Sequence, residues 1–255
     1  NKYGKEMIFA LLHETGNNAA EIACHFGPSD HPEVPGRWQY YGVSLPFWRS
    51  YDKEDPRREF FYYDYTGDAK RDDQSDYGFH YMVPEEGVTV VPNDTTKYMQ
   101  NVATMKYTYD MISDAYYDGR TICIFRLSDV ILCKAEIENN LNGPAAALPY
   151  LNQIRARAGA PEYGKHNRFP APSTKEAMND AILKERGYEL VFEFQRRADL
   201  IRFGKYEEVV NAHLKKLGIA QPTNVTSSLR YFPYPLNDAQ LNPNLAAENP
   251  SRLPK

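Results

Sequence analysis

Apolar side chains recur every three or four residues between Phe125 and Ala158, which is the spacing of one helical face. Gly143 and Pro144 interrupt this pattern, and Gly159 follows its end, so the segment has one stop, one restart and a second stop. The expected inner faces comprise Leu127, Val130, Ile131, Ala135 and Glu138 to Leu141 in the first helix, and Ala147, Leu148, Leu151, Ile154 and Ala158 in the second. The pattern predicts a helical hairpin with a very short connection.

A third helix is predicted from Ser173 onward, because Glu176 stands three residues later and would complete a capping box. Apolar residues keep the helical spacing as far as Ile201, with an expected bend near Gly187 and an exit at Gly204. Charged residues are interleaved along it: Arg186, Glu189, Glu193, Arg196, Arg197, Asp199 and Arg202. Because opposite charges three or four residues apart can pair along a helix, we expect these side chains to pair within the helix.

The first 120 residues predict loops with short ordered pieces, because glycine and proline interrupt every periodic run. Met7 to Leu12 predicts a strand, and Leu45 to Tyr51 predicts a short helix that ends before Asp55-Pro56. The aromatic run from Phe60 to Tyr65 favours a strand.

The residues from Tyr231 onward are rich in proline and asparagine, and proline lacks the donor that helices and central strands need. We therefore expect an extended tail. The predicted fold is mainly α with long irregular loops and a few short strands. Within one domain, residues 1–120 are the loop-rich, ligand-facing region, residues 121–205 the helical scaffold, and residues 206–255 the tail. The hairpin, at about 34 residues, has the length of one tetratricopeptide-like repeat.

Composition excludes several classes of protein. The chain has 255 residues, of which 42% are apolar, and no run approaches the roughly 20 apolar residues that cross a bilayer. Its net charge is −4 and no block of basic residues is present, so nucleic acid is not an expected partner. The acidic residues between Asp64 and Asp76 lack the register of a calcium-binding loop, and the histidines are scattered. We expect no metal and no cofactor.

Catalytic motifs are also missing from the sequence. HExxH, GxSxG, GxxxxGK and GxGxxG do not occur. Paired carboxylates for sugar hydrolysis remain open, because their separation in space cannot be read from a sequence. The carboxylates that can be placed lie on an arginine-rich helix, where structural pairing is the expected role, so we predict no enzymatic activity.

Aromatic residues on polar loops are the best candidates for a ligand site. The chain contains 20 tyrosines, many outside any periodic segment, and rings with a polar tip suit wet recognition surfaces. Between Gly36 and Gly42 stand Arg37, Trp38, Gln39, Tyr40 and Tyr41. In this hypothesis Trp38 is the first choice as a platform for a sugar ring, and Tyr40 and Tyr41 are further platforms. Arg37 and Gln39 would hydrogen-bond the sugar hydroxyl groups. The alternative is that these rings pack the loop against the protein core. Trp48 beside Phe47 favours core packing and is kept as a minor candidate.

Three blocks of sequence have a recognisable pattern. The first runs from Phe125-Arg126-Leu127-Ser128-Asp129 to Ile154-Arg155-Ala156-Arg157-Ala158-Gly159, the second from Ile182 to Lys205, and the third from Phe232-Pro233-Tyr234-Pro235 to Asn249-Pro250. In order and spacing they resemble the SusD/RagB family of outer-membrane nutrient-binding lipoproteins. Asp55-Pro56-Arg57-Arg58 fits as well, so the likeness spans essentially the whole chain. One departure is Phe194-Gln195, which stands where the family usually has a glycine and a polar residue.

The resemblance implies a SusD-type fold and a non-catalytic function. The protein would bind a nutrient, most often an oligosaccharide or polysaccharide and in some members a peptide, and deliver it to a SusC-like TonB-dependent transporter. It would sit on the cell-surface side of the bacterial outer membrane, anchored by a lipidated amino-terminal cysteine that this chain does not contain. Ligand residues in the family lie in variable loops, so no single position can be carried over.

The family's proteins are about twice as long as this chain, which implies that it is the carboxyl-terminal half of such a protein. The amino-terminal half would then be a partner segment, and a helical array without it should expose an apolar flank, because repeat helices bury their faces only against neighbours. Two other classes stay open: a glycoside hydrolase, and a helical-repeat adaptor that binds a protein and no small ligand.

Overall fold

The structure of the chain is a computed structural model that describes residues 5–13, 25–28, 31–32, 39–67, 79–86, 96–106, 119, 121–216 and 225–248. Contacts divide it into two units, Asn1–Glu193 and Phe194–Lys255, which are treated separately below. The fold is mainly helical with a few short strands, as the sequence predicts.

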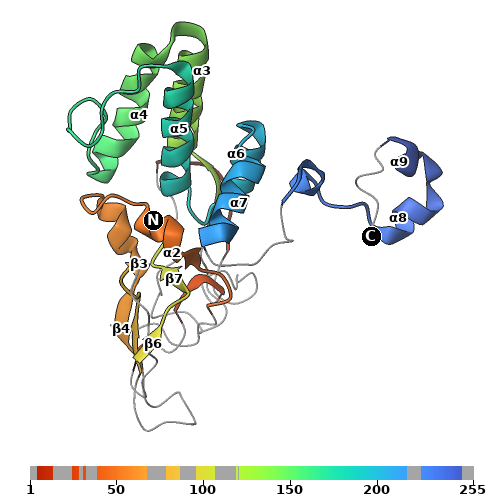
Figure 1. The fold of residues 1–255 in the computed structure, drawn as a ribbon, viewed down its shortest axis with the longest axis horizontal. Helices are drawn as coiled ribbons and strands as arrows, with labels where there is room; N and C mark the ends of the chain where they lie inside the picture. The colour runs from red at the N-terminus through yellow and green to blue at the C-terminus, as the bar shows by residue number, and fades with distance from the viewer. Residues whose placement is uncertain are drawn as a thin grey trace. The chain divides into compact units, whose positions relative to one another are not determined.

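The predicted helical hairpin is confirmed. Helix α3 spans Leu127–Asn142 and helix α4 spans Pro144–Ala158, with a single residue, Gly143, between them. Gly143 has a φ of 90° and Gly159, after α4, a φ of 72°, both in the region that glycine adopts without steric cost. Helix α5, Lys175–Glu189, packs against both members of the hairpin (Figure 1).

The buried face of α3 differs from the prediction. Its buried residues are Ser128, Leu132, Ala135 and Asn139, of which the predicted stripe included Ala135 and Asn139. Asn139 donates from Nδ2 to the carbonyl oxygen of Lys175 at 2.9 Å and to Asn179 Oδ1 at 2.8 Å, so a polar side chain joins α3 to α5. Apolar residues occur on two faces of this helix, and their periodicity alone could not identify the inner one.

Helix α5 starts and ends at different residues from those predicted. Thr174, rather than Ser173, caps it, because its hydroxyl accepts a hydrogen bond from Ala177 N at 3.1 Å. The helix ends at Glu189 and does not continue to Ile201. The intervening turn contains Phe192 and Phe194 with φ of 59° and 63°, a conformation that no helix contains.

The carboxylates near the end of α5 join elements that are distant in sequence. Glu185 accepts a hydrogen bond from Arg155 Nη1 at 2.7 Å, and Glu189 accepts one from Arg57 Nη1 at 3.1 Å. The expectation that the charges of this segment pair within one helix is therefore wrong for Glu189, whereas Asp199 and Arg202 do pair three residues apart, at 2.9 Å. The partners of Glu185 and Glu189 lie on α4 and on the 3₁₀ helix η1, Pro56–Phe60, so the carboxylates tie these elements to α5.

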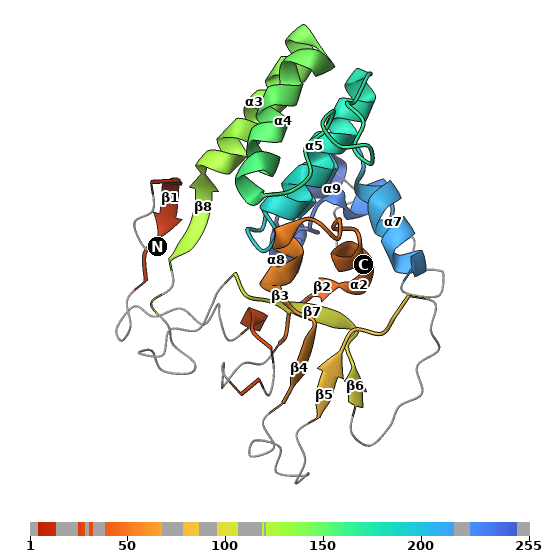
Figure 2. The same ribbon diagram turned by 90° about the vertical axis from the view of Figure 1, so that its left-hand side faces the viewer.

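Short strands form the other part of the first unit. The strands are β1 Met7–Leu11, β2 Val43–Ser44, β3 Phe61–Tyr62, β4 Asp64–Thr66, β5 His80–Met82, β6 Thr96–Tyr98, β7 Asn101–Thr104 and β8 Ile122–Arg126. They pair as β1–β8, as β2–β7–β3 and as β4–β5–β6 (Figure 2). The strand predicted at Met7 is confirmed, and so is the short helix after Ser44, which is α2, Leu45–Arg49. The aromatic run after Phe60 divides into β3 and β4.

An aromatic core lies where α2, these strands and the end of α5 meet. Its buried members are Val43, Leu45, Trp48, Tyr51, Phe61, Tyr65, Met99, Val102 and Tyr188. Tyr51 stacks on Tyr188 with ring centroids 4.2 Å apart, and Tyr51 donates to the Tyr188 carbonyl oxygen at 3.1 Å. Three tyrosines, Tyr51, Tyr65 and Tyr188, therefore serve the core, and the hydroxyl groups of Tyr51 and Tyr188 are hydrogen-bonded.

A set of exposed apolar side chains lies on three connected elements of the first unit. We call it the apolar flank; its residues are Ile8, Phe9, Leu11 and Leu12 at β1, Phe125 on β8, and Leu127, Val130, Ile137 and Leu141 on α3. The strands β1 and β8 pair only with each other in the described part of the chain, and β8 leads directly into α3. Within the described residues, no helix has the length and apolar character needed to span a bilayer.

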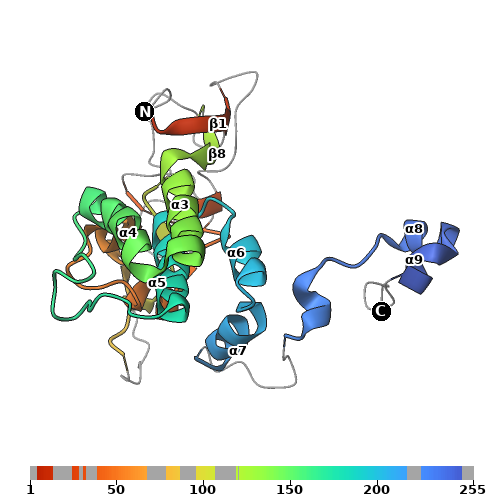
Figure 3. The same ribbon diagram turned by 90° about the horizontal axis from the view of Figure 1, so that it is seen from above.

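The second unit contains helices where we expected an extended tail. They are α7 Tyr206–Lys216, η2 Ser227–Arg230, α8 Leu236–Leu241 and α9 Pro243–Glu248, with α8 and α9 side by side (Figure 3). Helix α6, Arg196–Arg202, precedes them and falls within the predicted helical scaffold. The expectation failed because Pro235 and Pro243 stand at helix starts, where the missing N–H has no intrahelical partner to lose. Arg230 binds Glu207 at 2.6 Å and so joins η2 to α7.

Candidate functional site

The loop proposed from sequence as a ligand site is described in part. Arg37 and Trp38 lie outside the described residues. Gln39 has a φ of 47° and donates from Nε2 to Asn101 Oδ1 at 3.1 Å, so β7 supports the turn. At Gly42 an added Cβ would lie 2.1 Å from the same oxygen, and only glycine allows the loop to approach β7 so closely.

Tyr40 and Tyr41, which we call the tyrosine pair, are exposed on this loop by 65% and 59% of their surface. Both rings lie beside His25, with centroids 5.4 and 6.2 Å away, and Tyr41 also lies 5.6 Å from Phe26. The backbone N–H of Tyr41 donates to the carbonyl oxygen of His25 at 3.1 Å. Phe26 is buried against Phe192 and Ile122, so the tyrosine pair is supported from beneath while much of each ring faces solvent.

Trp48 is buried, with 6% of its surface exposed. The guanidinium of Arg58 lies over its ring at 4.2 Å, and the Tyr63 ring lies 5.2 Å away at an angle of 34°. Its Nε1 donates to the carbonyl oxygen of Arg58 at 3.4 Å. These contacts fit the core packing that the sequence favoured.

Trp48 nonetheless lines a pocket of about 430 Å³, which we call the Trp48 pocket. Its other lining residues are Arg49, Lys53, Arg58, Tyr63, Asp64, Met82, Val83, Pro84, Glu85 and Glu86. The volume falls within the roughly 300–1,000 Å³ of small-molecule sites. The lining combines aromatic and apolar side chains with charged side chains of both signs. The first kind can pack on the face of a ligand ring, and the second can hydrogen-bond its polar groups.

Sequence reasoning did not nominate the charged and aromatic neighbours of Trp48. Tyr63 donates to Glu59 Oε2 at 2.6 Å, and this hydrogen bond, followed by burial, raises the pKa of Tyr63. His80 lies 2.6 Å from Asp64 through Nε2. The run of aromatics around Tyr63 was a usable signal, but the pocket is lined by residues of α2, η1, β4, β5 and the segments that adjoin them, and their meeting is a property of the tertiary fold.

The carboxylates and histidines of the described segments form no cluster of three or more that could hold a metal ion. The acidic loop between Asp68 and Asp76 lies outside the described residues.

Comparison with known proteins identifies relatives along most of the chain. The model of the SusD family matches residues 27–251. SusD-like protein P38 of Formosa agariphila is 27% identical over 218 residues, covering 81% of this chain and 41% of that protein. The starch-binding protein SusD of Bacteroides thetaiotaomicron is 28% identical over 137 residues, covering 53% of this chain and 22% of that protein.

Solved structures show the same fold. Surface glycan-binding protein A from Bacteroides thetaiotaomicron, in complex with laminarihexaose, aligns with a TM-score of 0.63 at 21% identity. The alignment covers 92% of this chain and 50% of that one. The chain therefore spans about half the length of this solved relative, and less than half of the two curated relatives above.

Proposed function

The chain belongs to the SusD family, and we propose that it is part of a non-catalytic receptor that binds an oligosaccharide or polysaccharide at the bacterial cell surface. The observation that supports this most directly is the tyrosine pair, Tyr40 and Tyr41, held on a braced loop with both rings largely exposed. The relatives named as starch-binding and as bound to laminarihexaose support a glycan as the ligand class.

Sugar rings present apolar C–H faces that pack on aromatic side chains, while amides and charged groups order the hydroxyls. Tyr40 and Tyr41 supply the rings in this proposal, and Gln39 lies next to them in the chain. Trp38 and Arg37 stay assigned to the same surface by their place in the sequence. Trp48 contributes through the pocket it lines, where its ring is fixed by Arg58 and Tyr63.

The apolar flank supports a second part of the proposal, which concerns partners. These exposed apolar residues lie on β1, on its partner strand β8 and on α3, which follows β8 directly, and exposed apolar surfaces mark interaction sites. We assign the flank to the amino-terminal half of the same protein. Val130→Glu should weaken association with that half, whereas Gln153→Glu, at an exposed position on α4 outside the flank, should not; equal effects in a pull-down would contradict the assignment.

The family resemblance supplies the rest of the proposed context. The complete protein would be lipid-anchored on the outer membrane through an amino-terminal cysteine and would pass its ligand to a SusC-like TonB-dependent transporter. Co-purification of that transporter with the tagged complete protein from membranes tests this step.

Glycan binding is tested by titrating the chain with laminarihexaose and maltohexaose in a calorimeter and analysing the sugar afterwards. We expect binding of at least one hexasaccharide, no shorter product, and at least tenfold weaker binding in Tyr40→Ala and Tyr41→Ala. Phe60→Ala is the matched control, because it removes a ring that is 57% exposed on η1. Release of shorter sugars would favour a glycoside hydrolase, and unchanged affinity in both tyrosine variants would remove the tyrosine pair from the site.

A further inference from the structure

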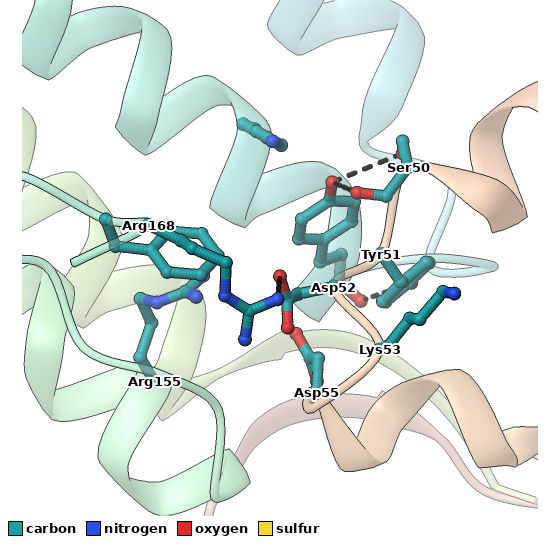
Figure 4. Close-up of a pocket in the computed structure, with 10 residues that line it drawn as sticks. Ser50, Tyr51, Asp52, Lys53, Asp55, Arg155 and Arg168 are labelled. Atoms are coloured by element: carbon teal, nitrogen blue, oxygen red, sulfur yellow. Dashed lines mark hydrogen bonds and ion pairs between the residues drawn. The ribbon is translucent and has the colours of Figure 1, made fainter. Parts of the chain in front are cut away.

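A second, polar pocket of about 260 Å³ opens between the segment that follows α2 and helices α4 and α5 (Figure 4). Its charged lining residues are the cations Lys53, Arg155, Arg168 and Lys184 and the anions Asp52 and Asp55. Cationic side chains outnumber carboxylates in this lining. The volume lies below the roughly 300–1,000 Å³ of pockets that enclose whole drug-sized molecules, so it suits a single chemical group better than an oligosaccharide.

Arg155 is buried, with 1% of its surface exposed, yet one of its nitrogens has no partner. Nε donates to the carbonyl oxygen of Pro161 at 2.5 Å, Nη1 donates to Glu185 Oε2 at 2.7 Å, and the guanidinium lies 4.6 Å from the Phe169 ring. Nη2 makes no hydrogen bond within the described part of the chain. A buried donor on a charged group is costly to leave without an acceptor, and Arg155 is one of the residues that line the pocket.

Lys184 adds a second cation from α5. Its ammonium lies 5.7 Å from the Tyr188 ring, and no carboxylate among the described residues forms an ion pair with it. Burial and then the charge of Arg155 lower the pKa of Lys184, which means that the two cations repel each other across a partly desolvated space. An anion between them would relieve this repulsion.

The carboxylates of the pocket already have cationic partners. Asp52 Oδ2 accepts a hydrogen bond from Arg168 Nη1 at 2.9 Å, and Asp55 Oδ2 accepts one from Arg57 Nη2 at 2.8 Å. In Figure 4, Arg155 and Arg168 approach from one side, and Asp52 and Asp55 lie on the other. Asp52 and Glu185 act to raise the pKa of Lys184, but burial and the charge of Arg155 outweigh them, so the carboxylates offset only part of the positive charge.

We propose that this pocket binds one anionic group, a carboxylate or a sulfate ester, through Arg155 Nη2 and the Lys184 ammonium. Arginine and lysine are the donors that recognise such groups, and charge-assisted hydrogen bonds are the stronger kind. Lys53 lines both this pocket and the Trp48 pocket. The inference goes beyond the proposed function, since the group binds here whatever molecule bears it.

The test uses three probes at constant pH and ionic strength: galacturonate, its uncharged methyl ester, and inorganic sulfate. Binding is followed by calorimetry and by the Arg155 Nε–H resonance in the NMR spectrum. We expect galacturonate to bind at least tenfold more tightly than the ester and to shift the Arg155 resonance. Competition by sulfate would extend the site to sulfate esters, and failure of sulfate to compete would assign it to carboxylates.

Lys184→Gln should weaken galacturonate binding at least fivefold without lowering the melting temperature, because Lys184 is an exposed position on α5 and makes no ion pair with a described carboxylate. Lys215→Gln is the matched control, since it removes the same charge from an exposed position on α7. Equal binding of galacturonate and its ester would overturn the proposal, and so would equal effects of the two lysine variants. An Arg155 resonance that galacturonate leaves in place would overturn it without any variant. Binding of neutral hexasaccharides is measured separately, so a failure here leaves the proposed function intact.

Discussion

Arg126, at the end of β8, donates from Nε to both carboxylate oxygens of Glu193, at 3.0 and 2.8 Å, across 67 residues of sequence. Both side chains are largely buried, with 12% and 4% of their surface exposed. The same guanidinium donates from Nη1 to Glu189 Oε1 at 2.6 Å. One arginine therefore fixes the entry to the helical hairpin against the turn that follows α5.

We expect Arg126→Met to destabilise the chain by about 3–5 kcal/mol, because it leaves two buried carboxylates without their main partner. The free energy of unfolding from urea titrations measures this loss. Lys165→Met is the control: Lys165 pairs with Glu162 at 2.7 Å on the surface, and its loss should cost less than about 1 kcal/mol. Similar losses in the two variants would show that the Arg126 pair contributes no more than a surface pair.

The carboxylate of Glu189 makes stability depend on acid. Burial alone would raise its pKa, but the charges of Arg126, Arg157 and Arg57 outweigh burial and hold the pKa of Glu189 below its ordinary value. A group with a lowered pKa in the folded state stabilises the fold above its unfolded pKa, about 4.3, and loses that contribution as the pH falls through the folded value.

The free energy of unfolding should therefore be flat near neutral pH with respect to this group and fall once the pH drops below about 4. Glu189→Gln should lower the free energy of unfolding at neutral pH and make its decrease below about pH 4 less steep. Glu162→Gln, which removes a carboxylate from the surface pair with Lys165, should leave the steepness of that decrease unchanged. Chemical unfolding at a series of pH values measures this dependence in the wild type and both variants. The same decrease at acid pH in all three proteins would show that Glu189 does not contribute to it.

The helical scaffold could be predicted from the sequence where signals are local. Gly143 and Gly159 place the ends of the hairpin helices within a residue, since each has a backbone conformation that glycine adopts freely. The end of α5 could not be found in this way. Leu190, Val191 and Phe194 continue the helical spacing, and the turn at Phe192 and Phe194 follows from tertiary contacts that override it.

Phe194 offers a test of that turn. Its φ of 63° lies in the left-handed region, which costs a residue with a Cβ roughly 1–2 kcal/mol, and the resembled family usually has glycine here. We expect Phe194→Gly to raise the free energy of unfolding by about 1 kcal/mol, through relief of this strain. Phe194→Ala keeps the Cβ and controls for loss of the ring. A glycine variant no more stable than the alanine variant would show that the turn is not strained.

The same distinction, between local sequence signals and contacts made by the tertiary fold, applies to the candidate site. The composition of residues 36–42 nominated exposed rings, and Tyr40 and Tyr41 are exposed, although their binding role stays a prediction. Nothing local could place Arg58 over Trp48 or bring Arg155 and Lys184 to one pocket, because these residues come from different elements. Sequence predicts which loop is aromatic, and the tertiary fold decides which charges surround it.

The two tryptophans should respond to truncation in opposite ways. Trp48→Ala removes a buried ring between Arg58 and Tyr63, and we expect a loss of about 3–5 kcal/mol in the free energy of unfolding. Trp38→Ala should leave the melting temperature nearly unchanged and weaken hexasaccharide binding, because the hypothesis places its ring against the sugar. Thermal unfolding and calorimetric titration of both variants separate the roles. A large loss of stability in Trp38→Ala would make Trp38 a core residue, and the sugar platform would then consist of Tyr40 and Tyr41.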